Sequence, residues 1–203
     1  MKPILSAILL SFSLLMSLAT VSQPWEVDKS KDGIIVHTKA VSGSDFKSFK
    51  AVVLIDAAPA DILKLLKDAE SYTRWYGYTK SAQILKVEGD IQYNYVETTF
   101  PWPYENRDMV YRMSIDSSNE QETKVNLKGI PDYIPEKRGI VRMIKAEGHI
   151  LLKPINGKTE ITYVFHSEPG ENIPVWLANS SIAELPYQTL LGLREMLRVE
   201  SEP

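Results

Sequence analysis

The sequence contains no cysteine, and this absence excludes several kinds of chemistry at once. Without thiols there can be no disulfide bond, thiolate metal site, cysteine nucleophile or lipid anchor on cysteine. An excess of basic residues is also missing, since 23 Lys and Arg stand against 26 Asp and Glu. Nucleic-acid-binding domains are usually basic, so we expect no nucleic-acid partner. With 203 residues, 44% of them hydrophobic, the chain can form one domain with a buried core.

Common catalytic and metal-binding motifs are missing too. The sequence has no Gly-x-Ser-x-Gly motif, no glycine-rich phosphate loop and no His-Glu-x-x-His motif. Its histidines, His37, His149 and His166, fall on separate predicted strands without a carboxylate at metal-ligand spacing. We therefore predict that the protein is not an enzyme and holds neither a cofactor nor a metal. His166 is a candidate for a cavity wall, because it follows the apolar run 163–165.

The first residues have the pattern of a signal peptide. Lys2 precedes the apolar run Ile4–Leu18, and Ser17–Ala19 offers a small-x-small cleavage site. A membrane anchor is the alternative, but a span needs about 20 apolar residues and this run is shorter and contains four serines. We therefore predict a cleaved signal peptide at residues 1–19, a mature domain at 20–203, and a periplasmic or secreted protein.

Short runs rich in β-branched and aromatic residues, separated by turn residues, predict about nine strands. The predicted strands are Trp25–Lys29, Gly33–Ala40, Ser48–Asp56, Ser81–Val87, Ile91–Thr99, Arg107–Asp116, Glu122–Lys128, Ile140–Lys153 and Thr159–Ser167. With two prolines and two glycines, the segment Gly129–Gly139 is predicted to be a loop.

Two segments have helical spacing. The first, Pro59–Glu70, begins with proline and an early acid, which suit a helix N-terminus. The second, Pro174–Arg198, repeats its apolar residues every three or four positions. Pro186 lies within it, and an interior proline costs about 3 kcal/mol, so we predict a kink or break near Ile182.

The most unusual stretch joins two predicted strands at residues 100–110. It reads Phe-Pro-Trp-Pro, then Asn-Arg-Asp and Met-Val, and its two prolines make it stiff. Taken alone, it predicts a rigid connection with a local ion pair between Arg107 and Asp108. The motif also resembles the signature loop of the START (StAR-related lipid-transfer) domains, and the likeness extends over nearly all of Trp25–Arg198.

The resemblance implies an α+β helix-grip fold, in which a curved antiparallel sheet of about nine strands wraps around a long C-terminal helix. It implies a short aromatic helical segment near Trp75. It also implies that residues 20–203 form a START-like lipid-binding domain, which binds and transfers a lipid or other hydrophobic ligand in an internal cavity without catalysis. Sterol-binding members carry an arginine where this chain has Met113, so the departure argues against a sterol ligand.

Strand alternation supplies the candidate site residues. Glu97 shares a face with Tyr93 and Tyr95, and since a lone buried carboxylate is costly it faces either solvent or a partner in the cavity. The resemblance implies an acid that reaches the ligand. On the next strand four residues from Arg107 to Met113 share a face. The candidate ligand-binding residues are Tyr93, Tyr95, Glu97, Arg107, Met109, Tyr111, Met113, His166, Ile182 and Leu190.

Large apolar residues on the predicted loops are candidates for transient membrane contact, with nearby cations attracting anionic lipid. These apolar residues are Trp102, Tyr133, Ile134 and Trp176, and the cations are Lys137, Arg138, Arg142 and Lys145. The alternative is that they pack over the core.

We expect a monomer. Two other functions stay open: an enzyme of the helix-grip superfamily, of cyclase or hydrolase type, using Tyr95, Glu97 and His166 as acid–base groups, or an interaction module whose interior is filled by its own side chains.

Overall fold

The computed structural model describes residues 24–119 and 121–201. The predicted signal peptide, residues 1–19, lies outside the described residues and stays a prediction. None of the helices in the described part has the length and hydropathy needed to cross a bilayer.

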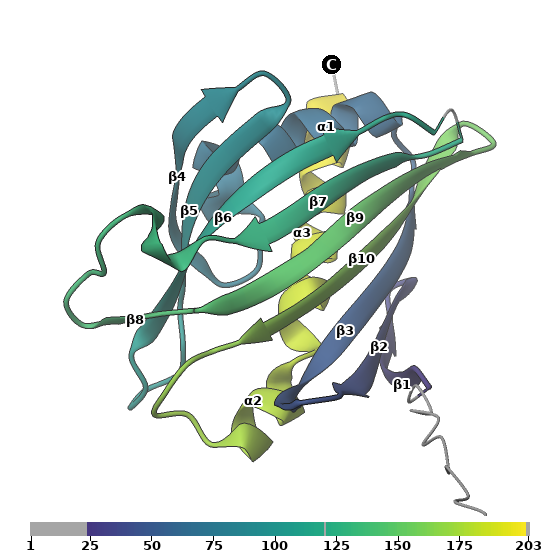
Figure 1. Cartoon of the computed structure of the whole chain (residues 1–203). Coiled ribbons are helices and arrows are strands. Elements are labelled where there is room, and N and C mark those ends of the chain that lie inside the picture. The colour runs from purple at the N-terminus through teal and green to yellow at the C-terminus, as the bar shows by residue number, and fades with distance from the viewer. Residues whose placement is uncertain (1–23, 120, 202–203) are drawn as a thin grey trace, which may run out of the picture.

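Within the described residues ten strands form one curved sheet (Figure 1). The strands are β1 (Glu26–Lys31), β2 (Ile34–Val41), β3 (Ser44–Ile55), β4 (Thr79–Glu88), β5 (Ile91–Thr98), β6 (Asn106–Asp116), β7 (Thr123–Gly129), β8 (Ile140–Arg142), β9 (Lys145–Ile155) and β10 (Lys158–Glu168). Their order is β1-β2-β3-β10-β9-β7-β6-β5-β4, all antiparallel, and β8 pairs with β6 in parallel.

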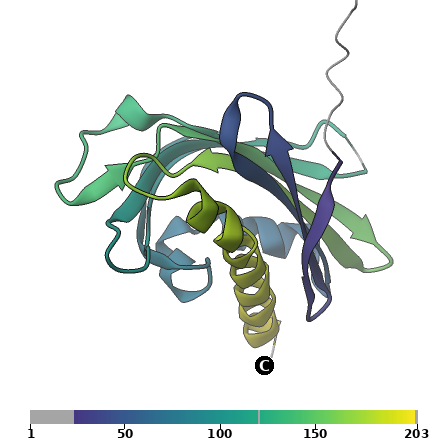
Figure 2. The ribbon, with the colours of Figure 1, turned by 90° about the horizontal axis from the view of Figure 1, so that it is seen from below.

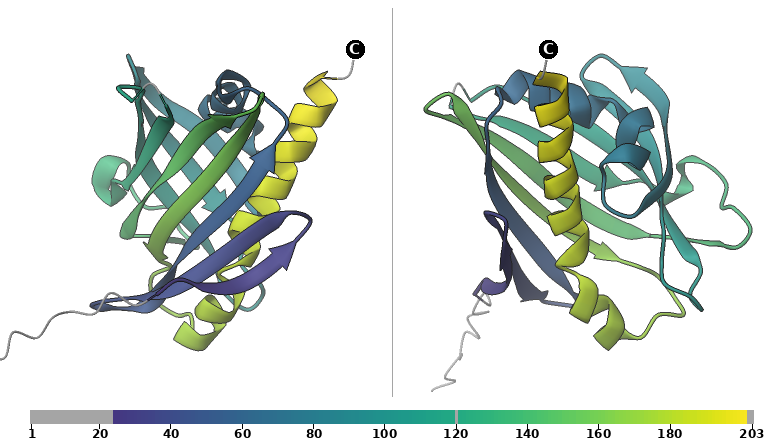
Figure 3. Two further views of the ribbon diagram at one scale, coloured as in Figure 1. Left: turned by 90° about the vertical axis from the view of Figure 1, so that its right-hand side faces the viewer. Right: turned by 180° about the vertical axis from the view of Figure 1, so that it is seen from behind.

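The helices other than η2 lie against the concave face of the sheet, which arches over them (Figures 2 and 3), whereas η2 belongs to the loop between β7 and β8. They are α1 (Pro59–Lys67), the 3-10 helices η1 (Ala69–Arg74) and η2 (Pro131–Tyr133), α2 (Val175–Ser181) and α3 (Glu184–Ser201). Inward side chains of the sheet and one face of α3 form the core, including Val53, Leu152, Ile161, Leu190 and Leu193. Burying each such side chain stabilises the fold by about 1.5–3 kcal/mol. The predicted helix-grip fold is confirmed.

The sheet has one strand more than predicted, because the run Ile140–Lys153 is not a single strand. Its first residues form β8, whose partner is β6, and its later residues form β9, whose partners are β7 and β10. The chain changes partner between the two, where the Met143 amide donates to the Asp108 carbonyl at 2.9 Å. Local sequence shows a β-forming run but not this change of partner.

The break predicted near Ile182 in the last helix is confirmed. Helix α2 ends at Ser181 and α3 begins at Glu184. Pro186 therefore lies in the first turn of α3, where its missing amide hydrogen breaks no helical hydrogen bond. The first helix ends at Lys67 rather than at the predicted Glu70, and η1 follows it before Trp75, as the resemblance implied.

Candidate ligand-binding cavity

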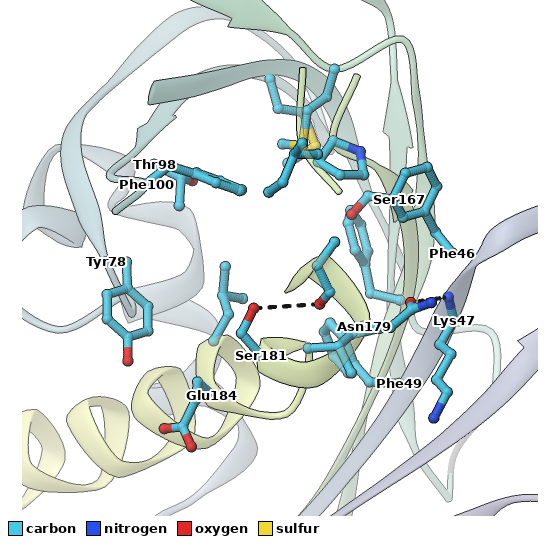
Figure 4. A pocket seen from close by; sticks show the side chains of 18 of the residues that line it. Phe46, Lys47, Phe49, Tyr78, Thr98, Phe100, Ser167, Asn179, Ser181 and Glu184 are labelled. Carbon is cyan, nitrogen blue, oxygen red and sulfur yellow. Dashed lines mark hydrogen bonds between the residues drawn. The ribbon is translucent and has the colours of Figure 1, made fainter. Parts of the chain in front are cut away.

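A cavity of about 490 Å³ lies between the concave face of the sheet, α2 and the start of α3. Sites for small organic ligands usually have volumes of about 300–1,000 Å³. Most of its lining is aromatic or aliphatic, and Figure 4 shows many of these side chains around the empty space. The main apolar lining residues are Phe46, Phe49, Tyr76, Tyr78, Val96, Phe100, Pro101, Met109, Tyr111, Met143, Tyr163, Phe165, Ile173, Leu177, Ala178, Ile182 and Leu185.

One end of the cavity is closed by the core, and tyrosines form this end. On β6 Met109 and Tyr111 line the cavity, whereas the next inward residue, Met113, is packed in the core. On β10 the same change falls between Tyr163, which lines the cavity, and Ile161, which is fully buried in the core. We call this end of the cavity, formed by Tyr76, Tyr111 and Tyr163, the tyrosine end.

The opposite end, the loop end, is bounded by two loops and α2. Phe100 and Pro101 come from the loop after β5, Pro169 and Ile173 from the segment before α2, and Leu177 from α2 itself. On the same segments Trp102 is 92% exposed and Trp176 is 71% exposed. Two large indole rings in solvent therefore lie beside the loop end.

Arg107 joins the two loops of the loop end. Its Nε donates to the Pro169 carbonyl at 3.0 Å and its Nη2 to the Glu171 carbonyl at 2.8 Å. Its Nη1 donates to the Glu105 carbonyl, and the guanidinium lies 4.6 Å from the centre of the Phe100 ring. The side chain is fully buried, and this burial lowers the pKa of Arg107. Arg107 thus fixes the shape of the loop end without lining the cavity.

The predicted ion pair between Arg107 and Asp108 is wrong. Adjacent strand residues point to opposite faces, so Asp108 lies on the convex side of β6. There its Oδ1 and Oδ2 accept bonds from Nε and Nη2 of Arg142, at 2.7 and 3.1 Å. Arg142 also donates to the Pro131 carbonyl and, at 3.1 Å, to the Ile134 carbonyl. Both charges are buried, so Arg142 is not a surface cation available to a membrane.

Helix α2 forms a wall of the cavity and has no buried residue. Asn179 attaches it to β3. Its Oδ1 accepts from the Lys47 amide at 2.9 Å (Figure 4), and its Nδ2 donates to the Asp45 carbonyl at 2.9 Å. Helix α3 differs, because its apolar face is in the core. The predicted C-terminal helix is therefore two helices: α2, which lines the cavity and is partly exposed, and α3, whose apolar face is buried in the core.

Of the predicted ligand-binding residues, Met109, Tyr111 and Ile182 line the cavity. Tyr93, Tyr95 and Glu97 do not, because Val96 and Thr98 are the β5 residues that face it and alternation directs their neighbours to the convex side. The convex side is covered locally, since Tyr133 stacks on Tyr93 and Lys137 lies 3.6 Å from the Tyr95 ring centre.

Glu97 faces neither solvent nor the cavity. It is only 6% exposed, and its partners are Asn106 Nδ2 at 2.7 Å, Lys80 Nζ at 3.0 Å and Ser81 Oγ at 3.2 Å. Burial alone would raise the pKa of Glu97, but the hydrogen bonds from Asn106, Lys80 and Ser81 outweigh it and the pKa is lowered. The carboxylate is therefore held ionised by structural partners.

The other predicted site residues lie elsewhere. Met113 and Leu190 are in the core beyond the tyrosine end, and Arg107 is behind the loop end. His166 points away from the cavity, with its Nδ1 3.3 Å from the Lys47 carbonyl oxygen, while Phe165 beside it faces inward. Tyr95 and Glu97 on β5 are separated from His166 on β10 by β6, β7 and β9, so the proposed acid–base trio does not come together.

The prediction missed most of the aromatic lining. On β10 the inward-facing Tyr163 and Phe165 alternate with Thr162 and Val164, and this period-two pattern can be read from the sequence. The prediction nevertheless selected the neighbouring His166. Phe46 and Tyr76 carried no such signal, because one lies near a strand end and the other in a loop. Among the described residues, no group of three or more His, Cys, Asp or Glu side chains is placed to hold a metal ion.

Comparison with known proteins gives concordant results. Residues 13–197 match the family model of the START domain. A Pseudomonas aeruginosa protein of uncharacterised function is 35% identical over 86% of this chain and 87% of its own. The mouse phosphatidylcholine transfer protein is 26% identical over 79% of this chain and 78% of its own. The crystal structure of a StAR-related lipid transfer protein from Xanthomonas axonopodis superposes with a TM-score of 0.81, at 36% identity, covering 86% of this chain and 98% of that one.

Proposed function

This chain belongs to the START domain family, and from that premise we propose that it binds one lipid or other hydrophobic molecule in its cavity and transfers it without covalent chemistry. The apolar cavity, closed by tyrosines at one end and covered by α2, carries this proposal. Burying an acyl chain there recovers about 0.8 kcal/mol per CH₂ group, which lets an insoluble molecule cross water. The names of the relatives, which include lipid transfer proteins, support the same ligand class.

The setting we propose is outside the cytoplasm, with the protein acting as a monomer. The signal-peptide pattern of residues 1–19 supports export to the periplasm or the medium. Because the cavity is formed by a single chain, one copy suffices to enclose a ligand.

Filling the cavity should abolish ligand uptake. Replacing Ala178 with tryptophan places an indole in the cavity from α2, and we expect lipid uptake from labelled vesicles to fall at least about 10-fold, since each lost CH₂ contact costs about 0.8 kcal/mol. Native mass spectrometry of the freshly purified wild-type protein should show a co-purifying lipid that the variant lacks.

The matched control is Ala60→Trp, which adds the same ring at an exposed position of α1. It should take up lipid like the wild type, and both variants should keep the wild-type melting temperature. If Ala178→Trp took up lipid normally, the lipid would not bind in this cavity. If the wild-type protein neither co-purified with lipid nor acquired it, the ligand-free interaction module would be the better account.

Delivery requires the loop end to meet a membrane transiently, and Trp102 and Trp176 are the contact residues we propose. Both rings are exposed beside the cavity, and indole is well suited to a membrane interface. We expect the double variant Trp102→Ala/Trp176→Ala to bind vesicles at least about 10-fold more weakly in a flotation assay, given about 1.5–3 kcal/mol per buried apolar side chain.

Val87→Ala serves as the control for vesicle binding, because Val87 is exposed on the β4–β5 hairpin, at the opposite end of β5. It should leave vesicle binding unchanged. Equal loss in the control and the double variant, or no loss in either, would contradict a membrane contact at the loop end.

A further inference from the structure

The tyrosine end contains a pair of hydroxyl groups that the fold itself leaves incompletely bonded. The hydroxyl oxygens of Tyr76 and Tyr163 lie 2.6 Å apart, one from the loop after η1 and the other from the middle of β10. Both residues line the cavity. Their rings come from opposite sides of its closed end and meet at their polar tips.

A count of donors shows what the pair lacks. Two phenol hydroxyls have two protons, and the bond between them uses one. The neighbouring Tyr72 hydroxyl is occupied, because it donates to the Leu66 carbonyl at 2.5 Å. Within residues 24–119 and 121–201 the Tyr76–Tyr163 pair has no further hydrogen-bond partner. One proton is therefore available to an acceptor that enters the cavity.

The surroundings of the pair favour an uncharged acceptor. The charged residues that line the cavity are Lys47 and Glu184, and Glu184 is paired with Lys29. At the tyrosine end the other lining side chains are uncharged: the Tyr111 phenol and apolar side chains such as Phe49 and Val96. An ionised group buried there would lack a counter-charge and pay a large desolvation cost.

The two hydroxyls also remain protonated. Burial raises the pKa of Tyr76 and of Tyr163 well above that of a free phenol. The neighbouring tyrosines add to the rise at Tyr76, whereas at Tyr163 the hydrogen bond with Tyr76 lowers the pKa by less than burial raises it. The pair is consequently a neutral donor at neutral pH.

We propose that the Tyr76–Tyr163 pair is a specificity site, which selects hydrophobic ligands whose buried end carries an uncharged oxygen acceptor such as an ester or ketone carbonyl. This inference rests on the proposed binding function and names the chemistry of its ligand. An ester carbonyl can accept a hydrogen bond from the hydroxyl that is not used within the pair. A carboxylate at the same place would have no cation beside it, and a hydrocarbon would leave the hydroxyl without an acceptor.

The test uses three probes with a similar chain length: methyl dodecanoate, dodecanoate and tridecane. Their dissociation constants are measured by equilibrium partition of the radiolabelled probe into the full-length protein. The wild type should bind methyl dodecanoate at least about 10-fold more tightly than dodecanoate, because the carboxylate must be desolvated without a cation.

The decisive variant is Tyr76→Phe/Tyr163→Phe, which removes both hydroxyls and keeps both rings. It should lose about 3- to 10-fold of its affinity for methyl dodecanoate, the worth of one hydrogen bond, and keep or gain affinity for tridecane. Each single variant keeps one free hydroxyl and should retain most of the preference. Removing both partners of a buried bond is nearly neutral for stability, so the double variant should fold.

Tyr187→Phe is the matched control, since the Tyr187 hydroxyl bonds Asp32 at 2.5 Å and does not line the cavity. It should leave the ranking of the three probes unchanged. A double variant that changes all probes equally, or a wild type that binds dodecanoate as tightly as its ester, would overturn the specificity site while leaving lipid binding intact. Binding of none of the probes would overturn lipid binding itself.

Discussion

Replacing Arg142 with methionine is expected to lower the free energy of unfolding by about 3–5 kcal/mol, measured by denaturant titration. The substitution keeps much of the side-chain volume but removes the guanidinium that bonds both oxygens of Asp108. Asp108 would then be a carboxylate with no exposed surface and no cation beside it. Desolvation of an unpaired buried charge costs more than the pair itself contributes, which explains the size of the effect.

The same guanidinium holds the loop between β7 and β8. It donates to the carbonyls of Pro131, Ile134 and Pro135, so Arg142→Met should also release this loop. Faster proteolysis within the loop should accompany the loss of stability. Arg138→Met, an exposed change in the same loop, is the control and should shift stability by no more than about 0.5 kcal/mol.

A second variant separates the pair from simple packing. In Asp108→Asn/Arg142→Met the buried negative charge is gone, so the double variant should be more stable than Arg142→Met alone. If the double variant were instead as unstable as the sum of its two single changes, Asp108 and Arg142 would act independently and the buried ion pair would not be the cause.

Much of the fold was readable because its signals are local. Turn sequences delimited most strands, and Pro186 predicted the division of the last helix. The partner change between β8 and β9 was not readable, because it depends on which distant strand accepts each segment. Alternation predicts that neighbouring residues face opposite sides, but it does not say which side is concave.

The candidate site shows that limit on two adjacent strands. On β6 the chosen face, with Met109 and Tyr111, is the one toward the cavity. On β5 the face with Tyr93 and Tyr95 was chosen for its aromatic residues, although it is convex. It is aromatic because the loop between β7 and β8 covers it, and Tyr133 stacks on Tyr93 with ring centres 4.9 Å apart. The aromatic face of β5 thus correctly indicated a buried surface, but this surface is buried by the loop between β7 and β8 and does not line the cavity.

The second large effect is expected from one methyl group on α3. Gly192→Ala would place its new Cβ 2.2 Å from the carbonyl oxygen of Trp75 and 3.0 Å from two other Trp75 backbone atoms. Backbone cannot rotate away as a side-chain end can, so α3 or the Trp75 segment must move. We expect a loss of at least about 3 kcal/mol in the free energy of unfolding, the upper range for overpacking.

The sign of the Gly192→Ala result is informative, because helix propensity predicts the opposite. Alanine is favoured over glycine inside a helix by about 1 kcal/mol, so a helix without this contact would be stabilised. Val199→Ala, an exposed change in the same helix, controls for α3 itself and should have little effect. A raised melting temperature for Gly192→Ala would mean that α3 does not rest on the Trp75 backbone.

The contact at Gly192 also reaches the cavity. Trp75 precedes Tyr76, whose hydroxyl lies 2.6 Å from that of Tyr163, so a shift of the Trp75 backbone carries Tyr76 away from its partner. Whatever folded Gly192→Ala protein remains should therefore lose its preference for methyl dodecanoate over tridecane, whereas Val199→Ala should keep it. Helix α3 then acts as a fixed support that aligns the tyrosine end of the cavity.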